Sequence, residues 1–542
     1  MRSAVRYICS MELRPALPDR AAALALRVGA VTVVLAAAPY KQFDLDRFFV
    51  PKELVLHVTA LVVGVLCLMR ARRLVLARVD QLLAGFLGLG LISAVFATNW
   101  WLAGRAAAIS VAGVVCFWGA RTLARRGLER PLVAALAAAG VIGAVTALLQ
   151  AYGVRTEYVS LNRAPGGTLG NRNFMAHLCV IALPALALTA LRARSRNGYL
   201  GWTAGVALVG AALVMSRSRA AWLALIVGVV VMSPLGVIAL RRGRGELRLR
   251  RLLLLPVAAA LGAGASLVLP NTLDWRSDSP YLDTAKSVVN YKEGSGHGRL
   301  IQYKSTLRMS LRHPLFGVGP GNWAVEYPHF AAVEDPSLSS EGMTSNPWPS
   351  SDWMTYLSER GVFAFALLGL AFLALVADAL RGVSGELTEP EDRLRATTLL
   401  GTLAIVLVVG SFDAVLVLPV GALIAWALLG ALSSTSRERS AVALPPVRRS
   451  GAVLLLGAGL AFAAVRSATQ LSAMAIFSTT TRASRLERAS QLDPGSYRIQ
   501  VRLATGYLNR GSCTKARAHA SNAHALFPNA PAPRRILREC GG

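Results

Sequence analysis

Two arginines stand at the edge of an apolar stretch, in the segment Ser-Arg-Ser-Arg at residues 216–219. Arg217 and Arg219 come directly before a long run of mostly apolar residues. Snorkelling of the side chain toward water explains one arginine at such a position, but it explains two less well. A guanidinium group pairs with phosphate oxygens through two parallel hydrogen bonds. The two arginines are therefore suited to hold a phosphate or a diphosphate.

Another arginine opens an amphipathic stretch. From Arg299 onward, apolar and basic residues alternate with helical spacing, which predicts a helix on or near a membrane surface that ends before Pro314. The glycine-rich segment 317–322 predicts a turn whose backbone can approach another group. Asn322 in this turn and His329 beyond it are candidates for substrate contacts.

Two carboxylates stand at the start of a later apolar stretch. Ser351 and Asp352 are favourable residues for the beginning of a helix. On that helix Asp352, Thr355 and Glu359 lie near one face. An ionisable residue at the edge of a membrane span is a functional candidate, so both carboxylates are candidate catalytic groups. A simple ion pair between Glu359 and Arg360 is the alternative.

The segment GGTLGNRNFMAH, residues 166–177, leads into another apolar stretch. Its glycines allow tight turns, and Asn171 and Asn173 can cap the helix that follows. Capping explains one of the two asparagines. The functional interpretation is a nest of backbone N–H groups at a helix N-terminus, which suits an anionic ligand. A purely structural turn is the alternative.

Apolar stretches of membrane-spanning length dominate the chain. It has 542 residues, of which 54% are hydrophobic and 16% charged. Runs of this kind cross about 30 Å of hydrocarbon as helices, and they predict an all-α, multi-pass membrane protein with about thirteen spans. The predicted spans are 21–39, 53–69, 81–97, 105–121, 131–152, 174–191, 199–215, 220–240, 252–269, 357–380, 396–412, 414–432 and 451–465.

Arginine-rich loops alternate with loops that are poor in basic residues. The net charge of +29 would suit a nucleic-acid partner, but the arginines lie between the spans rather than on one soluble face. Anionic membrane lipids are the expected general partner. The positive-inside rule places the N-terminus and these loops in the cytoplasm. The arginine-rich loops are 70–78, 121–130, 192–196, 241–251, 381–395 and 433–449.

This sidedness divides the chain into five parts. The long polar insert lies on the outer side, and an odd number of spans leaves the C-terminal tail outside as well. The expected parts are a cytoplasmic segment (1–20), nine spans (21–269), a periplasmic loop (270–350), four further spans (351–465) and a small helical domain (466–542).

The tail contains a repeat of 34 residues, in which Ala489, Leu492 and Pro494 recur as an equivalent set in 523–528. This period resembles a tetratricopeptide repeat, and a helical cap without a further role is the alternative. Cys513 and Cys540 could close a disulfide in an oxidising compartment. No cysteine or histidine spacing typical of a metal site is present, and no cofactor is expected.

Five segments in order resemble the O-antigen ligase and polymerase superfamily. They are DQLLAGFLGLGLISAVFATNWWLAGR, GGTLGNRNFMA, SRSRAAWLALIVG, GRLIQYKSTLRMSLRHPLFGVGPGNW and WMTYLSERG, and together they cover roughly residues 80–432. A tetratricopeptide-like tail is common among such proteins.

The resemblance implies a metal-independent glycosyltransferase. Such enzymes take a glycan from undecaprenyl diphosphate at the periplasmic face of the bacterial inner membrane. They pass it to lipid A core or to a growing polysaccharide. Arg219 and Arg299 match the family's arginines and are the expected partners of the diphosphate, with Arg217 as a lesser candidate.

One departure concerns the base that receives the acceptor's proton. Ligases of this superfamily carry a histidine where this chain has Ser350, and serine alone is no base near neutral pH. Asp352, Glu359, Glu326 or His329 could replace it. A polymerase that relies on arginines, or a loss of activity, also remains open.

Two hypotheses from other classes compete with an enzyme. A transporter for lipid-linked glycans would carry ionisable residues or broken helices at mid-membrane, whereas here the polar residues gather at the outer rim. A non-catalytic scaffold would use the tail to hold envelope proteins. The absent histidine keeps that hypothesis open.

Overall fold

The computed structural model describes residues 16–159, 164–241, 246–275, 277–286, 294–339, 343–385, 389–434 and 440–541. Its regular structure is helical except for one pair of short strands. In the described part of the chain, nine helical segments are long and apolar enough to cross a membrane. The predicted all-α, multi-pass fold is confirmed.

The helices of the first half are α2 (Leu17–Leu35), α3 (Asp46–Met69), α4 (Arg78–Ala94), α5 (Trp100–Leu123), α6 (Glu129–Ala151), α7 (Arg172–Leu191), α8 (Arg196–Ser216), α9 (Arg219–Arg241) and α10 (Glu246–Val268). Those of the second half are α11 (Pro280–Lys286), α12 (Gly294–Arg312), α13 (Trp323–Glu326), α14 (Asp352–Ser384), α15 (Pro390–Phe412), α16 (Pro419–Leu432) and α17 (Pro446–Thr479). The tail adds α18 (Ala483–Leu492), α19 (Tyr497–Leu508), α20 (Cys513–Leu526) and α21 (Pro531–Glu539). Short turns are η1 (Lys41–Phe43), η2 (Ala124–Leu128), η3 (Gly167–Leu169) and η4 (Tyr327–His329).

Each of the thirteen predicted spans overlaps one of these helices. The count of nine is smaller because α5 and α6 form one kinked segment, Trp100–Ala151. In addition, α4 has only 17 residues, α16 has only 14, and α2 carries three charged residues, Asp19, Arg20 and Arg27, among its 19. Helix α2 begins inside the segment predicted to precede the first span.

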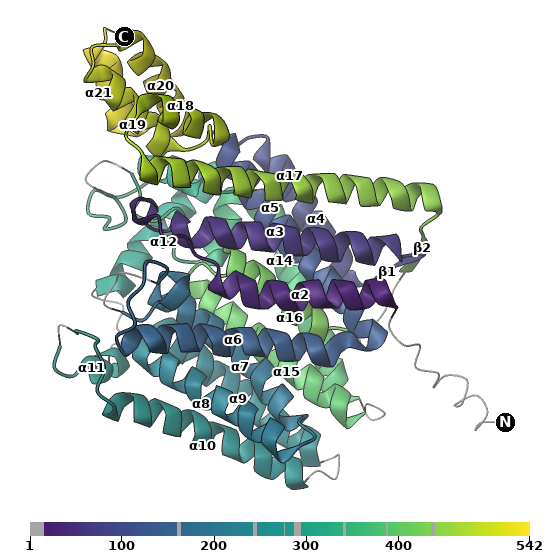
Figure 1. The fold of residues 1–542 in the computed structure, drawn as a ribbon. Helices are drawn as coiled ribbons and strands as arrows, with labels where there is room; N and C mark the ends of the chain where they lie inside the picture. The colour runs from purple at the N-terminus through teal and green to yellow at the C-terminus, as the bar shows by residue number, and fades with distance from the viewer. Residues whose placement is uncertain are drawn as a thin grey trace.

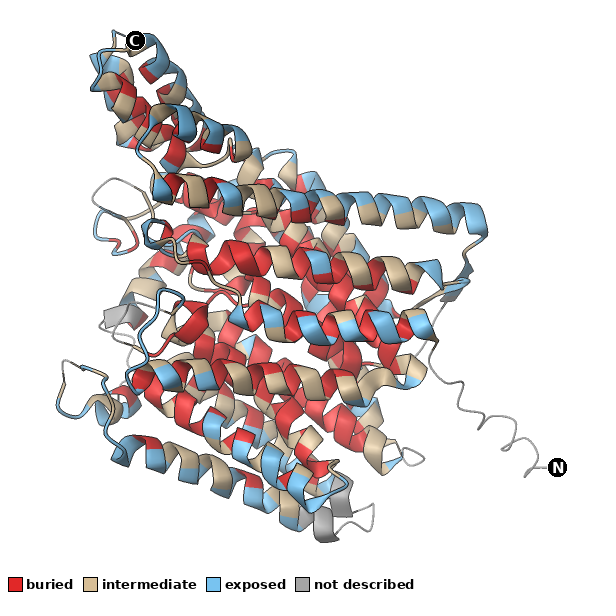
Figure 2. Cartoon of the chain, viewed as in Figure 1, coloured by how far each residue is buried: buried red, intermediate tan, exposed pale blue. Residues whose placement is uncertain are grey.

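The long helices run side by side between two ends of the molecule (Figure 1). Helices α11 and α12 and the tail lie at one end, which we call the outer end. The arginine-rich links between α3 and α4 and between α5 and α6 lie at the other, the inner end. Buried residues fill the centre of the bundle (Figure 2). Helices α7 and α15 are 78% buried over their most apolar windows, against 11% for α10, so α10 lies at the margin.

Two strands join distant links at the inner end. Strand β1 (Arg73–Leu76) pairs antiparallel with β2 (Ser440–Ala443). The sequence analysis treated both segments as plain loops. Each segment is a short run with valine at its centre. Neither segment alone predicts a strand, because the pairing depends on the other segment lying beside it.

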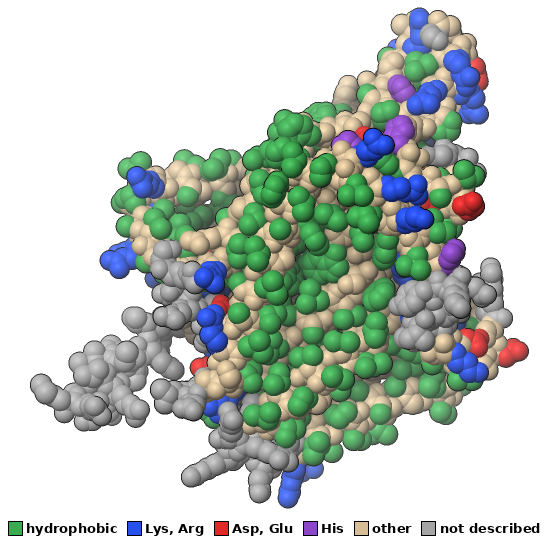
Figure 3. Space-filling view, turned by 180° about the vertical axis from the view of Figure 1, so that it is seen from behind, with side chains coloured by type: hydrophobic (Ala, Val, Ile, Leu, Met, Phe, Trp, Pro, Cys, Tyr) green, Lys and Arg blue, Asp and Glu red, His purple; other side chains and the backbone are tan. Residues whose placement is uncertain are grey.

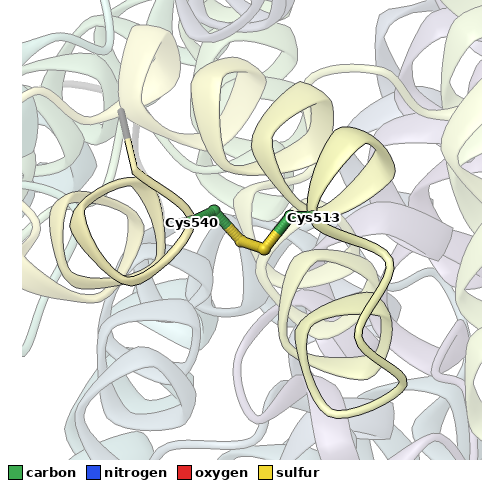
Figure 4. Close-up of a disulfide and its surroundings, with 2 residues drawn as sticks. All are labelled: Cys513 and Cys540. Atoms are coloured by element: carbon green, nitrogen blue, oxygen red, sulfur yellow. A yellow bond between two sulfur atoms is a disulfide. The ribbon is translucent and has the colours of Figure 1, made fainter.

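The tail packs against the outer end of the bundle. Helix α17 is continuous from Pro446 to Thr479, so the predicted boundary at residue 465 falls inside it. Tail residues share a buried cluster with Phe43 and Val50 of the bundle. A disulfide joins Cys513, which begins α20, to Cys540, which follows α21 (Figure 4).

A kink in α14 links it to the loop before it. Gly361 interrupts the helix with φ of 78° and ψ of 173°. The kink frees the carbonyls of Ser358 and Glu359, which accept hydrogen bonds from the N–H groups of Val318 and Gly319 at 3.0 Å each. The predicted glycine turn 317–322 is thereby held against α14.

A Gly361→Ala substitution should destabilise the protein strongly. A Cβ at this position would lie 2.1 Å from the carbonyl oxygen of Leu315 and would carry a positive φ. We expect a loss of about 2 kcal/mol or more, measured as a lower melting temperature in detergent. Gly369→Ala on the same helix is the control, because its Cβ would meet nothing within 4 Å. Equal melting temperatures for the two variants would contradict the proposed role of the kink.

Candidate functional site

Arg217 lies in the short link between α8 and α9. It adopts a left-handed conformation with φ of 52° and ψ of 33°. Its Nε donates a hydrogen bond to Thr284 Oγ1 at 2.9 Å, and its guanidinium lies 4.5 Å from the centre of the Trp275 ring. Burial lowers the pKa of Arg217, while Tyr281 and Asp283 act in the opposite direction. These contacts offset a backbone strain of about 1 kcal/mol.

Two more guanidinium groups lie beside Arg217. Arg172, the first residue of α7, lies 5.7 Å from the centre of the same Trp275 ring. Arg219, the first residue of α9, is near enough for its charge to act on Arg172, as does that of Arg217. Trp275 thus holds two arginines by cation–π contacts, and a third like charge lies beside them.

Arg299 belongs to a second group of side chains. It lies on α12, and its charge acts on His177 of α7 and on Asp413 in the link between α15 and α16. Asp413 is 9% exposed, and its Oδ1 accepts a hydrogen bond from the Ala414 N–H at 2.9 Å. Burial raises the pKa of Asp413 to about 6, against the opposing effects of Arg299, Ala414 and Asn173.

The amino end of α7 lies between the two groups. Asn171 caps the helix by accepting a hydrogen bond from the Asn173 N–H at 2.8 Å. Arg172 contacts the first group and Asn173 interacts with the second. The helix dipole adds partial positive charge at this end. We call Arg172, Arg217, Arg219 and Arg299 the arginine cluster. The predicted anion-binding residues Arg219 and Arg299 therefore lie on either side of one helix terminus.

Ser350 is held beside Arg299. Its N–H donates to Gln302 Oε1 at 2.7 Å, and its carbonyl accepts from the Tyr303 hydroxyl at 2.5 Å. Gln302 and Tyr303 follow Arg299 by about one helical turn, so they share its face of α12. The Tyr303 hydroxyl also donates to the Ser411 carbonyl at 2.8 Å, which brings the same face close to Asp413.

Asp352 has a structural role that its position in the sequence does not reveal. It is fully buried, and its carboxylate accepts hydrogen bonds from the backbone N–H groups of Val415, Leu416 and Val417 at 2.9, 2.8 and 3.3 Å. This set of donors satisfies the charge and fixes the link between α15 and α16. The carboxylate therefore positions the link that carries Asp413.

Glu359 is occupied in the same way. It is 3% exposed and accepts hydrogen bonds from the N–H groups of Gly321 and Trp323 at 2.7 and 3.3 Å. The alternative ion pair with Arg360 is not among the salt bridges of the described residues. Arg360 instead donates to Ser110 Oγ at 2.5 Å. Glu359 thus fixes the position of the glycine turn, and its carboxylate does not face an open site.

Among the described residues, the contacts of Asn322 and His329 include no member of the arginine cluster. Asn322 is fully buried, accepts from the Asn99 N–H at 2.7 Å, and donates to the carbonyls of Asn99 and Pro320. All of these partners are backbone groups, so Asn322 is a clamp between two segments. His329 is exposed at the end of η4. Glu326, the other candidate base, accepts from the Thr98 hydroxyl at 2.6 Å.

The sequence analysis did not single out four residues of the site. Arg172 and His177 lie in the segment 166–177, where only the asparagines drew attention. Trp275 and Asp413 are single polar or aromatic residues near the ends of apolar stretches. His177 is 2% exposed, and neither of its ring nitrogens has a hydrogen-bond partner within the described part of the chain. The sequence offers one indication of these residues, namely an ionisable side chain at the edge of a membrane span.

Among the described residues, no group of three or more His, Cys, Asp or Glu side chains is placed to hold a metal ion.

Comparison with known protein families gives a match to one part of the chain. The family model described as O-Antigen ligase matches residues 204–369. This range begins in α8, includes Arg217, Arg219 and Arg299, and ends in α14. No curated protein matches the chain. The chain is thus a multi-pass membrane protein with an O-antigen ligase family domain, which suggests a membrane enzyme of the ligase or polymerase type.

Asp413→Asn should change how stability depends on pH. The folded-state pKa lies above the usual 3.8, so the folded protein binds this proton more tightly than the unfolded chain. As pH rises from about 4 to about 6, the wild-type protein should lose on the order of 3 kcal/mol relative to the variant, and nothing further above that range. Unfolding in detergent at several pH values measures this difference.

Asp278→Asn, which removes an exposed carboxylate of the outer loop, is the control. Its difference from the wild-type protein should not vary over the same range. A flat profile for Asp413→Asn as well would show that Asp413 is not buried in this environment.

Proposed function

We propose that this protein is a metal-independent glycosyltransferase. In this proposal it moves a glycan from undecaprenyl diphosphate to a sugar hydroxyl at the periplasmic face of the bacterial inner membrane. The observation that carries the proposal is the arginine cluster around the amino end of α7, three of whose members lie inside the matched family domain. The acceptor is lipid A core in a ligase and a growing polysaccharide in a polymerase.

The cluster suits the leaving group of such a reaction. The bond between the sugar's anomeric carbon and a diphosphate oxygen breaks, and negative charge grows on that oxygen. Preorganised cations stabilise this charge more in the transition state than in the substrate. Arg219 and Arg299 take this role in the proposal, with Arg172 and Arg217 supporting the second phosphate. The N-terminal N–H groups of α7 that Asn171 does not cap add donors.

Asp413 is the proposed acceptor of the proton. A new bond forms between the anomeric carbon and the acceptor oxygen, whose proton must leave. Ser350 cannot take it, and Asp352 and Glu359 are occupied by backbone donors. Asp413 lies within the electrostatic reach of Arg299, and its pKa of about 6 makes it a better base than an ordinary aspartate.

Two features support a periplasmic location for this end. The arginine-rich links lie at the inner end, which the positive-inside rule assigns to the cytoplasm. The tail lies at the outer end and carries a disulfide, and such bonds persist in oxidising compartments. The paired helices α18–α21 fit a tetratricopeptide-like unit, which would offer a docking surface to envelope proteins.

Arg219→Ala and Arg299→Ala should each abolish most glycan transfer. We expect losses of about 100-fold, because each change removes a charge from the diphosphate site. Lysine at either position should restore transfer only partly, since it cannot form the bidentate pair. The assay is the lipopolysaccharide and polysaccharide profile of a deletion strain that expresses each variant. Uncapped lipid A core indicates a ligase, and single-unit caps indicate a polymerase.

Arg312→Ala is the matched control. Arg312 is exposed at the end of α12, the helix that carries Arg299. This variant should transfer glycan like the wild-type protein at equal expression. Full transfer by both Arg219→Ala and Arg299→Ala would favour the non-catalytic scaffold.

A further inference from the structure

A large groove lies on the side of the bundle away from α8 and α9. It encloses about 1170 Å³ and is bordered by α3, α4, α5 and α17. We call it the lateral groove. On α5 its lining runs from Trp100 to Thr122, and at 1.5 Å per residue this is over 30 Å, about the thickness of the hydrocarbon core. Small residues such as Gly104, Ala108 and Gly459 keep its apolar middle open.

Protein closes both ends of the lateral groove. At the inner end, its lining includes all four residues of β1, which pairs with β2. At the outer end, Trp101 lies under the guanidinium of Arg466 at 4.4 Å, and Arg466 pairs with Asp493 of the tail at 3.0 Å. Exposed apolar side chains such as Phe462 and Leu91 line its side. The groove therefore opens toward the lipid, where apolar side chains cover the bundle between its charged ends (Figure 3).

The outer part of the groove is polar but has no surplus of positive charge. Arg105 donates to Glu53 at 2.6–2.9 Å and to Asp46 at 2.8 Å. Together with the ion pair of Arg466 and Asp493, this gives two arginines and three carboxylates at the outer end of the groove. Among the described residues, Arg105 and Arg466 are thus already paired with carboxylates, with which a phosphate would have to compete.

Several neutral groups at this end can bind hydroxyls. His57 borders the groove, is 2% exposed, and its Nε2 has no partner in the described part of the chain. Its Nδ1 lies 3.0 Å from Ser467 Oγ. Gln470 also borders the groove, and its amide makes no hydrogen bond to the described residues. The Gln470 amide is partly exposed, so it can donate to and accept from the hydroxyls of a ligand in the groove.

An indole ring stands at the mouth. Trp100 stacks on Trp101 with ring centres 3.9 Å apart, and Arg466 lies over the Trp101 ring. Trp100 is 62% exposed, so one of its faces is open. An exposed aromatic face at a membrane interface packs against the apolar C–H face of a sugar ring.

We infer that the lateral groove binds a membrane glycolipid with an uncharged saccharide head. The hydrocarbon chain lies between α4 and α17, and the sugar lies against Trp100, His57 and Gln470. The inference that this lipid binds depends only on the observations of the groove.

The groove and the amino end of α7 lie on opposite sides of one helix. Helix α3 separates them: Glu53 and His57 border the groove, while Phe49 on the same helix packs on Phe174, near the amino end of α7. A helix with its side chains is about 10 Å across. A saccharide of a few units spans that distance.

Native mass spectrometry of the full chain tests the inference. The protein is purified in a detergent without sugar groups and offered monoglucosyl-diacylglycerol or phosphatidylglycerol with the same acyl chains. The wild-type protein should retain one glucolipid, with a preference of about fivefold or more over the phospholipid. Equal retention of the phospholipid, or retention of neither lipid, would overturn the inference.

Three variants locate the site. Gly459→Trp should fill the groove and reduce glucolipid retention at least about tenfold, whereas Gly369→Trp, on a lipid-exposed face of α14, should not. Neither position has an atom within 4 Å of an added Cβ. Trp100→Ala should remove the preference for sugar while lipid still binds. Unchanged retention by Gly459→Trp would place the lipid elsewhere and contradict the inference.

Arg219→Ala separates this inference from the proposed function. It should retain the glucolipid like the wild-type protein, because Arg219 does not border the groove. If glucolipid binding fails while Arg219→Ala still abolishes transfer, only the inference is lost. If binding holds and Arg219→Ala transfers glycan normally, only the proposed function is lost.

Discussion

Mutual repulsion among Arg172, Arg217 and Arg219 beside one helix terminus is the constraint around which the outer end is built. At the inner end, arginines have carboxylate partners: Arg121 pairs with Asp80 at 2.5 Å, and Arg192 pairs with Glu129 at 2.8 Å. In the arginine cluster, Arg172 and Arg217 instead contact the Trp275 indole, and Arg217 also donates to the Thr284 hydroxyl. Like charges gathered beside a helix N-terminus cost free energy unless an anion joins them. The supporting turns and links hold the arginines in place despite that cost.

The carboxylates of α14 show how that support is organised. Asp352 binds three backbone N–H groups of the α15–α16 link, and Glu359 binds two N–H groups next to the glycine turn. Through these bonds one helix fixes both the link that carries Asp413 and the turn that follows α12. Substitution of either carboxylate would therefore disturb the site without implying a part in the chemistry.

The sequence predicted the fold well because hydropathy and the distribution of arginines are local properties. Thirteen apolar runs correspond to helices, and the two arginines of 216–219 were recognised because snorkelling explains two arginines at the edge of a span less well than one. The roles of Asp352, Glu359 and Asn322 could not be predicted, because their partners are backbone groups tens of residues away. Asp413 and His177 were missed for the same reason, since Arg299 reaches them only in the folded chain. The β1–β2 pair likewise depends on a register between links more than 360 residues apart.

The most direct test of the arginine cluster is a structure of the protein in a lipid nanodisc with a polyprenyl diphosphate. The account predicts two phosphate densities at the first turn of α7, between Arg219 and Arg299, with the prenyl chain running into the membrane. Diphosphate density in the lateral groove or at the β1–β2 end, with the arginine cluster empty, would contradict it.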